Sequence, residues 1–310
     1  MLSRIGNSLF WFGRYVERPE HLARYIYSQF LSSMDAPLLQ KREAILDSIA
    51  RMNGYQNGSP LSVSKVLSDV TINPLNNCSI LSSIYFAREN ARAARDSIST
   101  ELWETTNTFY HTLTSYPKKK IKSDGPFDFC QFIIERTTII RGLMDRTLIH
   151  DTGWSIVNFG IKLERAMQVV RILISKLQDV KDLDRSMIGG PLENYQWATL
   201  MKSCQAFDMS RRYYKRAPNR TNALEFLLLN PDFTNSVRFC LRHLELHLQN
   251  IDGKQIYDKQ EVGFVVGKMK SNFDFLTVDE LVDNAPEFLE TTLASLNEIG
   301  KMFEKQYLAY

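Results

Sequence analysis

The chain has 310 residues, 44% of them hydrophobic and 24% charged, and its formal net charge is +3. This composition is typical of a globular protein with a large core. The mild charge, without a clustered basic face, argues against a nucleic-acid binder. No apolar run approaches the roughly 18 residues of a membrane-spanning helix, and charge interrupts the N-terminal segment, unlike a signal peptide. We therefore expect a cytoplasmic protein that binds neither nucleic acid nor a membrane.

The first predicted element is a long helix, because apolar residues recur at spacings of three, four or seven through residues 9–30. Pro19 lies inside this helix and has no amide hydrogen to donate. We therefore expect a kink, or a break near Arg18.

Helical patterns also dominate the rest of the chain. Each of the Asn-Pro pairs at 73–74 and 230–231 ends one segment and introduces a long helix, with Asn77 or Ser79 as the first cap and Thr234 as the second. Signals for strands are weak. Loops are predicted at Met52–Ser59 and Ser115–Pro126. Helices are predicted at 80–110, 127–147, 154–178, 192–214, 221–229, 233–250, 259–275 and 285–307.

Two parts of the chain resemble each other. Residues 9–24 (LFWFGRYVERPEHLAR) and 156–171 (IVNFGIKLERAMQVVR) align without gaps on the pattern F-G-x-x-x-E-R-x-x-x-x-x-R, and NPLNNCSILSSI from Asn73 aligns with NPDFTNSVRFCL from Asn230 in the same order. We infer a tandem duplication with halves 1–150 and 151–310. No long linker separates them, so the expected fold is one compact all-α bundle with approximate internal two-fold symmetry.

A charged stripe borders the apolar face of the first helix. It consists of Gly13, Glu17, Glu20 and Arg24, and it recurs as Gly160, Glu164 and Arg171, with Met167 in the place of Glu20. Glycine in mid-helix predicts close approach of a neighbouring helix. A partly covered stripe is either a salt-bridge network that sets helix register or a polar cavity for an anionic or amide ligand.

Three further groups are candidate sites. Arg88, Arg92 and Arg95 share one side of a helix with interleaved acids, so they either bind an anion or form exposed ion pairs. His150 and Asp151 form either an acid–base pair or a capped helix end. The third group, His243 and His247, is not part of an HExxH motif, and the four cysteines are far apart, so no metal is expected. No nucleotide-binding loop is present, and no cofactor is expected.

With these residues in view, the chain resembles the bacterial Alpha-E family over nearly its whole length. Four ordered blocks carry the resemblance: MLSRIGNSLFWFGRYVERPEHLAR, SILSSIYFARENARAARDSISTELWE, GLMDRTLIHDTGWSIVNFGIKLERA and EFLLLNPDFTNSVRFCL. The chain departs from the usual pattern at Pro19, His21, Ile161, Lys162 and Met167. These departures fall largely in the second Glu-Arg segment, so the two segments need not be equivalent.

The resemblance implies an uncharacterised helical protein whose gene commonly lies beside genes for circularly permuted ATP-grasp and transglutaminase-like proteins. It therefore implies a part in ATP-dependent peptide or amide synthesis or modification. The candidate site combines the motif positions with the stripe: Arg14, Glu17, Arg18, Glu20, Arg24, Arg88, Glu89, Asn90, Arg92, Asp151, Trp154, Glu164, Arg165 and Arg171.

Three functional hypotheses follow. The first is a non-catalytic accessory protein that works with an ATP-grasp amide or peptide ligase, with a peptide or amino acid as a further ligand. The second is a stand-alone enzyme that uses Glu17 or Glu164 as a base in a central cavity, with arginines as an anion clamp. The third is a purely structural scaffold. The sequence leaves the oligomeric state open.

Overall fold

The computed structural model describes residues 3–35, 42–54, 62–183 and 189–309. Within these ranges the protein folds into α-helices joined by short connections, without a β-strand, which confirms the predicted all-α class. None of the described helices is both long and apolar enough to cross a membrane. The helices of the first half are α1 (Ser3–Asp35), α2 (Arg42–Met52), α3 (Val63–Thr71), α4 (Ile80–Ala93), α5 (Thr100–Thr114), α6 (Lys118–Ser123) and α7 (Phe127–Thr147). Those of the second half are α8 (Thr152–Lys181), α9 (Pro191–Ser203), α10 (Phe207–Tyr214), α11 (Arg220–Leu229), α12 (Val237–Asp252), α13 (Val262–Phe275) and α14 (Val278–Phe303).

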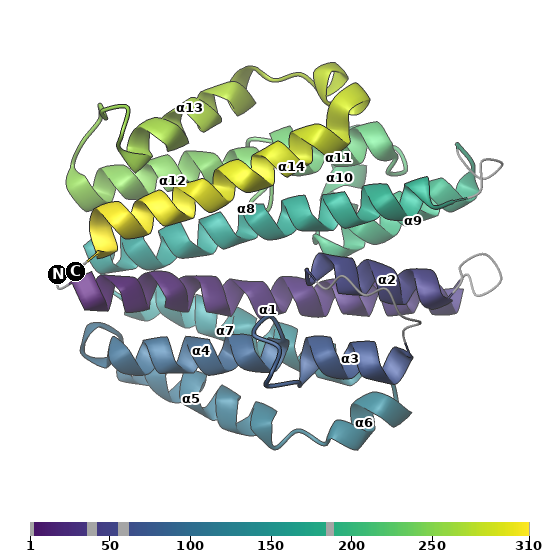
Figure 1. The fold of residues 1–310 in the computed structure, drawn as a ribbon, viewed down its shortest axis with the longest axis horizontal. Coiled ribbons are helices and arrows are strands. Elements are labelled where there is room, and N and C mark those ends of the chain that lie inside the picture. Colours follow the sequence, from purple (N-terminus) through teal and green to yellow (C-terminus); the bar gives the residue numbers. More distant parts are fainter. Residues whose placement is uncertain (1–2, 36–41, 55–61, 184–188, 310) are drawn as a thin grey trace.

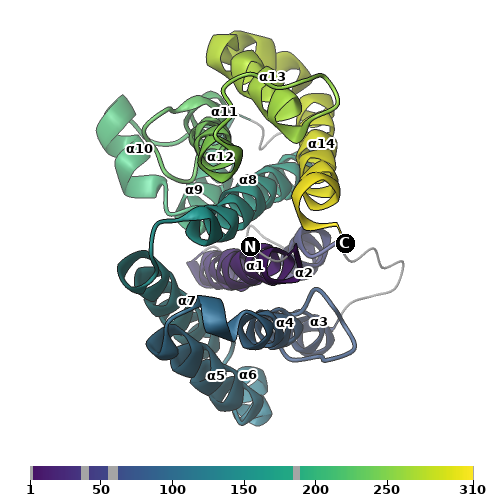
Figure 2. The same cartoon turned by 90° about the vertical axis from the view of Figure 1, so that its left-hand side faces the viewer.

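Helices α1 and α8 form the centre of the molecule (Figure 1). They run in the same direction, because residues that bond across them keep a nearly constant separation in the sequence: 150 for Arg14 and Glu164, 148 for Glu17 and Arg165. Figure 2 shows α3–α7 gathered on the α1 side and α10–α14 on the α8 side. One hydrophobic cluster contains buried residues of both halves, so the halves share a core.

The crossing of α1 and α8 depends on two glycines. A Cβ atom on Gly13 would lie 2.3 Å from the carbonyl oxygen of Val157, and one on Gly160 would lie 2.4 Å from that of Phe10. Val157 lies three residues before Gly160, and Phe10 lies three residues before Gly13. Each helix therefore offers the same position to the glycine of the other, and the two contacts are reciprocal. The predicted close approach at both glycines is therefore confirmed.

The turns before α4 and α12 have matching geometry. The Ser79 hydroxyl donates to the carbonyl oxygen of Asn73, and the Ser236 hydroxyl donates to that of Asn230. Ser79 and Ser236 are the N-caps, each accepting from the amide three residues later. The prediction of Ser79 is confirmed, whereas that of Thr234 is wrong by two residues.

Several predicted helix boundaries are wrong. The helix predicted at 80–110 is interrupted at Ala94, and the Ser99 hydroxyl caps a new helix by accepting from the Leu102 amide. The helix predicted at 192–214 is divided by Gln205, whose φ of 57° is left-handed. A short helix, α6, occupies the loop predicted at Ser115–Pro126. Part of the loop predicted at Met52–Ser59 lies outside the described residues.

The two helix-internal prolines behave differently. Helix α1 continues through Pro19 from Ser3 to Asp35, so the predicted interruption near Arg18 is wrong. Other helices pack along both flanks of α1, and this packing outweighs the single hydrogen bond that proline removes. In α14, Pro286 does coincide with a kink, at Asn284 (φ −118°, ψ 23°). That helix is also longer at its start than the predicted range of 285–307.

We expect Gly13→Ala to destabilise the protein by about 1–3 kcal/mol, because the new methyl group overpacks the crossing of α1 and α8. The matched control is Gly142→Ala in α7, where an added Cβ meets nothing within 4 Å and alanine should stabilise by about 0.5–1 kcal/mol. Urea denaturation measures both. Equal effects of the two substitutions would show that α1 and α8 do not approach as closely as described.

Candidate functional site

The carboxylate of Glu164 in α8 is bound by two arginines of α1. Arg14 Nε lies 2.8 Å from Oε2, and Arg18 donates through Nε to Oε1 at 2.7 Å and through Nη2 to Oε2 at 3.1 Å. Gln168, one helical turn beyond, donates to Oε1 at 2.7 Å. Glu164 is fully buried. Its charge is therefore neutralised from the opposite helix and its oxygens are occupied.

Glu17 in α1 is held in the same way from α8. Arg165 donates through Nε to Oε1 at 2.6 Å and through Nη2 to Oε2 at 3.2 Å. His21, one turn beyond Glu17, lies 3.1 Å from Oε1 and occupies the place that Gln168 has beside Glu164. The aligned Glu-Arg segments thus exchange ion pairs across the crossing.

Glu20 and Arg24 extend the Glu17 side. Arg24 binds Glu20 within α1 at 2.8 Å, and Arg141 of α7 reaches both acids, at 3.1 Å for Glu17 and 2.6 Å for Glu20. Arg141 was not among the candidate residues, although it lies in a charged junction of the sequence. It compensates for Ile161, which stands in α8 where the aligned position of α1 has Arg14.

The electrostatics keep both central glutamates ionised. Burial alone would raise the pKa of Glu17 and of Glu164, but the neighbouring guanidinium groups hold the pKa of each carboxyl well below its ordinary value. For Glu17 these groups are Arg165 and Arg141, and for Glu164 they are Arg18 and Arg14. A general base works best with a pKa near the operating pH and a free lone pair. Neither glutamate meets these conditions.

Little space remains beside Glu17 and Glu20. A cavity of about 10 Å³ touches Glu17, Glu20 and Arg141, which is room for about one water molecule. The arrangement therefore corresponds to the predicted salt-bridge network that sets helix register. The central polar cavity of the alternative hypothesis is not seen on this side.

The other candidates lie outside this cluster. Arg88 and Arg92 both pair with Glu89 along α4, and Asn90 donates to the Phe86 carbonyl oxygen of its own helix. These contacts match the interpretation of Arg-acid pairs along a helix. Asp151 caps α8 by accepting from the amides of Gly153 and Trp154.

The junction between the halves holds the remaining aromatic candidate. Trp154 stacks on His150 with ring centroids 4.0 Å apart. His150 lies 3.0 Å from the Asp145 carbonyl oxygen, and its expected partner Asp151 faces the helix amides instead. The capped helix end is the interpretation that these contacts support. Among the described residues, no group of three or more His, Cys, Asp or Glu side chains could hold a metal ion.

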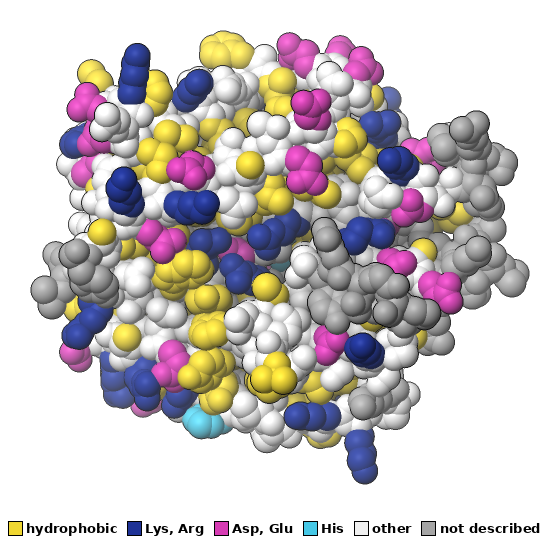
Figure 3. Space-filling view, in the orientation of Figure 1, with side chains coloured by type: hydrophobic (Ala, Val, Ile, Leu, Met, Phe, Trp, Pro, Cys, Tyr) yellow, Lys and Arg dark blue, Asp and Glu magenta, His cyan; other side chains and the backbone are white. Residues whose placement is uncertain are grey.

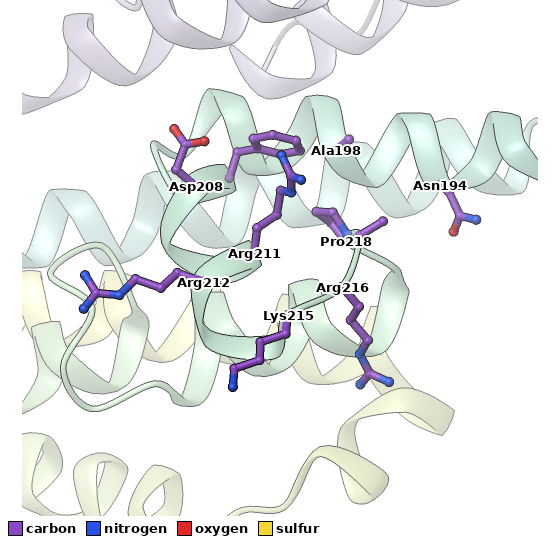
Figure 4. Close-up of a pocket in the computed structure, with 10 residues that line it drawn as sticks. Asn194, Ala198, Asp208, Arg211, Arg212, Lys215, Arg216 and Pro218 are labelled. Carbon is purple, nitrogen blue, oxygen red and sulfur yellow. The ribbon is translucent and has the colours of Figure 1, made fainter.

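A basic surface pocket of about 590 Å³ lies at α9 and α10, and no motif pointed to it. Arg211 lies over the Phe207 ring at 5.4 Å. In Figure 4, Arg212, Lys215 and Arg216 point in different directions and not toward one common point. This geometry does not favour a single ligand.

We expect Glu164→Gln to cost about 3–5 kcal/mol at neutral pH, because Arg14 and Arg18 would then face a neutral amide in a buried place. The folded-state pKa of Glu164 is lowered, so its stabilisation is present above the unfolded carboxyl pKa of about 4.3 and is lost as the pH falls below it. Urea denaturation at several pH values should therefore give a flatter profile between about pH 5 and 3 for the variant than for the wild type.

The control for this experiment is Glu104→Gln, an exposed position of α5, which should change stability by less than about 0.5 kcal/mol. A Glu164→Gln variant as stable as this control would mean that the buried pairs do not hold the helices together.

Comparison with known proteins gives a family but no activity. A family model described as a predicted alpha-helical domain with a conserved ER motif, Alpha-E, matches residues 1–308. An uncharacterised protein of Mycobacterium bovis and two of Mycobacterium tuberculosis are each 21% identical over 316 residues, covering 94% of this chain and 34% of theirs. The chain thus spans about a third of the length of these relatives. No solved structure matches the chain significantly. Glu17-Arg18 and Glu164-Arg165 are ER dipeptides at the crossing of α1 and α8. Because the family model covers nearly all of the sequence, the chain belongs to the Alpha-E family.

Proposed function

We propose that the protein is a non-catalytic helical component that works with an ATP-grasp type amide or peptide ligase, as its partner or as a carrier of its substrate. One observation carries the non-catalytic part. Glu17 and Glu164 are fully buried, and arginines of the opposite helix bind both carboxylates. A glutamate whose two oxygens are occupied in joining two helices is not free to act as a base on a substrate.

The proposed partnership rests on family context. In the mycobacterial relatives, the matching region is about a third of a longer chain. Joining two modules in one chain raises their effective concentration, which is useful when they act together. The resemblance to proteins encoded beside ATP-grasp genes suggests the chemistry of the proposed partner.

We further propose that the two halves arose by tandem duplication and retain approximate two-fold symmetry around α1 and α8. The reciprocal contacts of Gly13 and Gly160 support this history, as do the exchanged pairs of Glu17 with Arg165 and of Glu164 with Arg18. A two-fold relation produces such reciprocity, since each partner presents the same surface to the other.

The stand-alone enzyme is the second candidate, and the same observation disfavours it. A glutamate that serves as base must reach a substrate proton, directly or through one water. Both central glutamates already accept hydrogen bonds on each oxygen, and the cavity beside Glu17 is too small for a substrate. A purely structural scaffold is compatible with the network but would need no ligase.

Affinity purification of the tagged protein from its native cells, with quantitative mass spectrometry, tests the partnership. We expect an ATP-grasp protein at near-stoichiometric amounts, and ATP-dependent amide formation only when the two proteins are combined. The tag alone provides the background, and Gly142→Ala provides a folded surface variant. If the protein returned alone and hydrolysed ATP by itself, with the activity lost in a folded Glu17→Gln variant, the proposal would be wrong.

A further inference from the structure

The Glu164 side of the crossing carries an excess of positive charge. Arg14 and Arg18 bind the carboxylate of Glu164, and Arg171 follows Glu164 by two helical turns on the same face of α8. Three guanidinium groups and one carboxylate leave a formal charge of +2. Figure 3 shows Lys and Arg side chains gathered across the middle of the face on which α1 and α8 lie. Arg18 and Arg171 are partly exposed, whereas Arg14 is buried.

Arg171 is the unusual member of this group. Within the described part of the chain it makes no hydrogen bond or ion pair, and its side chain is only partly exposed. Its aligned counterpart in α1, Arg24, is bound at 2.8 Å by Glu20. Methionine replaces that acid in α8, at position 167. The absence of that carboxylate therefore explains why no acid is hydrogen-bonded to Arg171 among the described residues.

Methionine is a poor substitute for the missing acid. Arg14 Nη2 lies 3.5 Å from the Met167 sulfur, which is a weak acceptor. Burial lowers the pKa of Arg171, and the charges of Arg18 and Arg14 lower it further against the pull of Glu164. The guanidinium N–H groups of Arg171, which have no acceptor among the described residues, can donate to an anion.

Other groups around the cluster also suit an anion. The ring of Tyr15 lies 5.3 Å from the Arg18 guanidinium, and the Tyr15 hydroxyl has no hydrogen bond among the described residues. The exposed Cys78 acts on Arg18 and Arg171 as an acidic group that raises the pKa of each, so its thiol does not itself favour an anion. Cys78 directly precedes the Ser79 cap of α4, and the positive end of that helix dipole adds to the local potential.

We propose that the seam formed by Arg14, Arg18 and Arg171 beside Glu164 is a binding site for a phosphate group, with Arg171 as the principal donor. Phosphate carries about −1.5 to −2 charges at neutral pH, which matches the excess of +2, whereas a simple carboxylate would leave half of it uncompensated. The planar guanidinium suits bidentate binding of phosphate oxygens. This site is independent of the proposed ligase partnership.

Isothermal titration calorimetry with inorganic phosphate, at an ionic strength held constant with sodium chloride, tests the site. We expect saturable binding to the wild type and at least about tenfold weaker binding to Arg171→Gln, since a charge-assisted hydrogen bond is lost. Acetate should bind at least about tenfold more weakly than phosphate if charge matching selects the ligand. Circular dichroism confirms that each variant is folded.

Two further variants use the internal comparison between the helices. Arg24→Gln removes the aligned arginine that already has an acid partner, and phosphate binding should be unchanged. Met167→Glu provides the missing acid, so Arg171 should gain a partner and phosphate binding should be lost while Arg171 itself is intact.

Four results would overturn the proposal. They are the absence of saturable phosphate binding by the wild type, unchanged binding by Arg171→Gln, unchanged binding by Met167→Glu, and acetate binding as tight as that of phosphate.

Discussion

The structure depends on an exchange of buried ion pairs between α1 and α8. Arg18 of α1 binds Glu164 of α8, and Arg165 of α8 binds Glu17 of α1. Buried charges are costly unless they are paired and their remaining hydrogen-bonding capacity is used. The close crossing at Gly13 and Gly160 brings the backbones near enough for each arginine to reach the opposite glutamate. Packing and pairing therefore require each other, and the outer helices of each half surround this pair.

The two sides of the crossing differ in charge. The Glu17 side has two carboxylates for three guanidinium groups, because Glu20 is present and Arg141 enters from α7. The Glu164 side has one carboxylate for three. A single difference between Glu20 and Met167 thus separates a charge cluster that is largely satisfied internally from one that can attract an anion.

Sequence patterns were sufficient for the central features of the fold. The repeated F-G-x-x-x-E-R segment predicted the close approach at the glycines, and a salt-bridge network was one of the two interpretations of its charged stripe, because helix periodicity fixes which residues share a face. Helix existence was also predictable in most places. Helix boundaries were not, since the interruptions near Ala94 and Gln205 depend on local capping and on a left-handed residue.

Long-range partners could not be derived from the pattern. Arg141 lies 124 residues from Glu17, and only the packing of α7 on α1 brings them together. The isolation of Arg171 is likewise a property of the folded state, although the missing acid at Met167 was the visible signal for it. The grouping of Arg88, Arg92 and Asp151 with the Glu-Arg segments as one site came from motif blocks alone. In the structure Arg92 pairs within α4 and Asp151 caps α8, whereas Arg88 also joins α4 to α5 by donating to Asn107.

The central claim is that the exchanged ion pairs hold the two halves together, and a double-mutant cycle on Glu164 and Arg18 tests it most directly. The single variants Glu164→Gln and Arg18→Met and their combination are compared by urea denaturation at neutral pH. The account predicts a double variant more stable than the sum of the single losses implies, with a coupling energy of about 2 kcal/mol or more. Losses that add to within about 0.5 kcal/mol would contradict it, because the two groups would then be energetically independent.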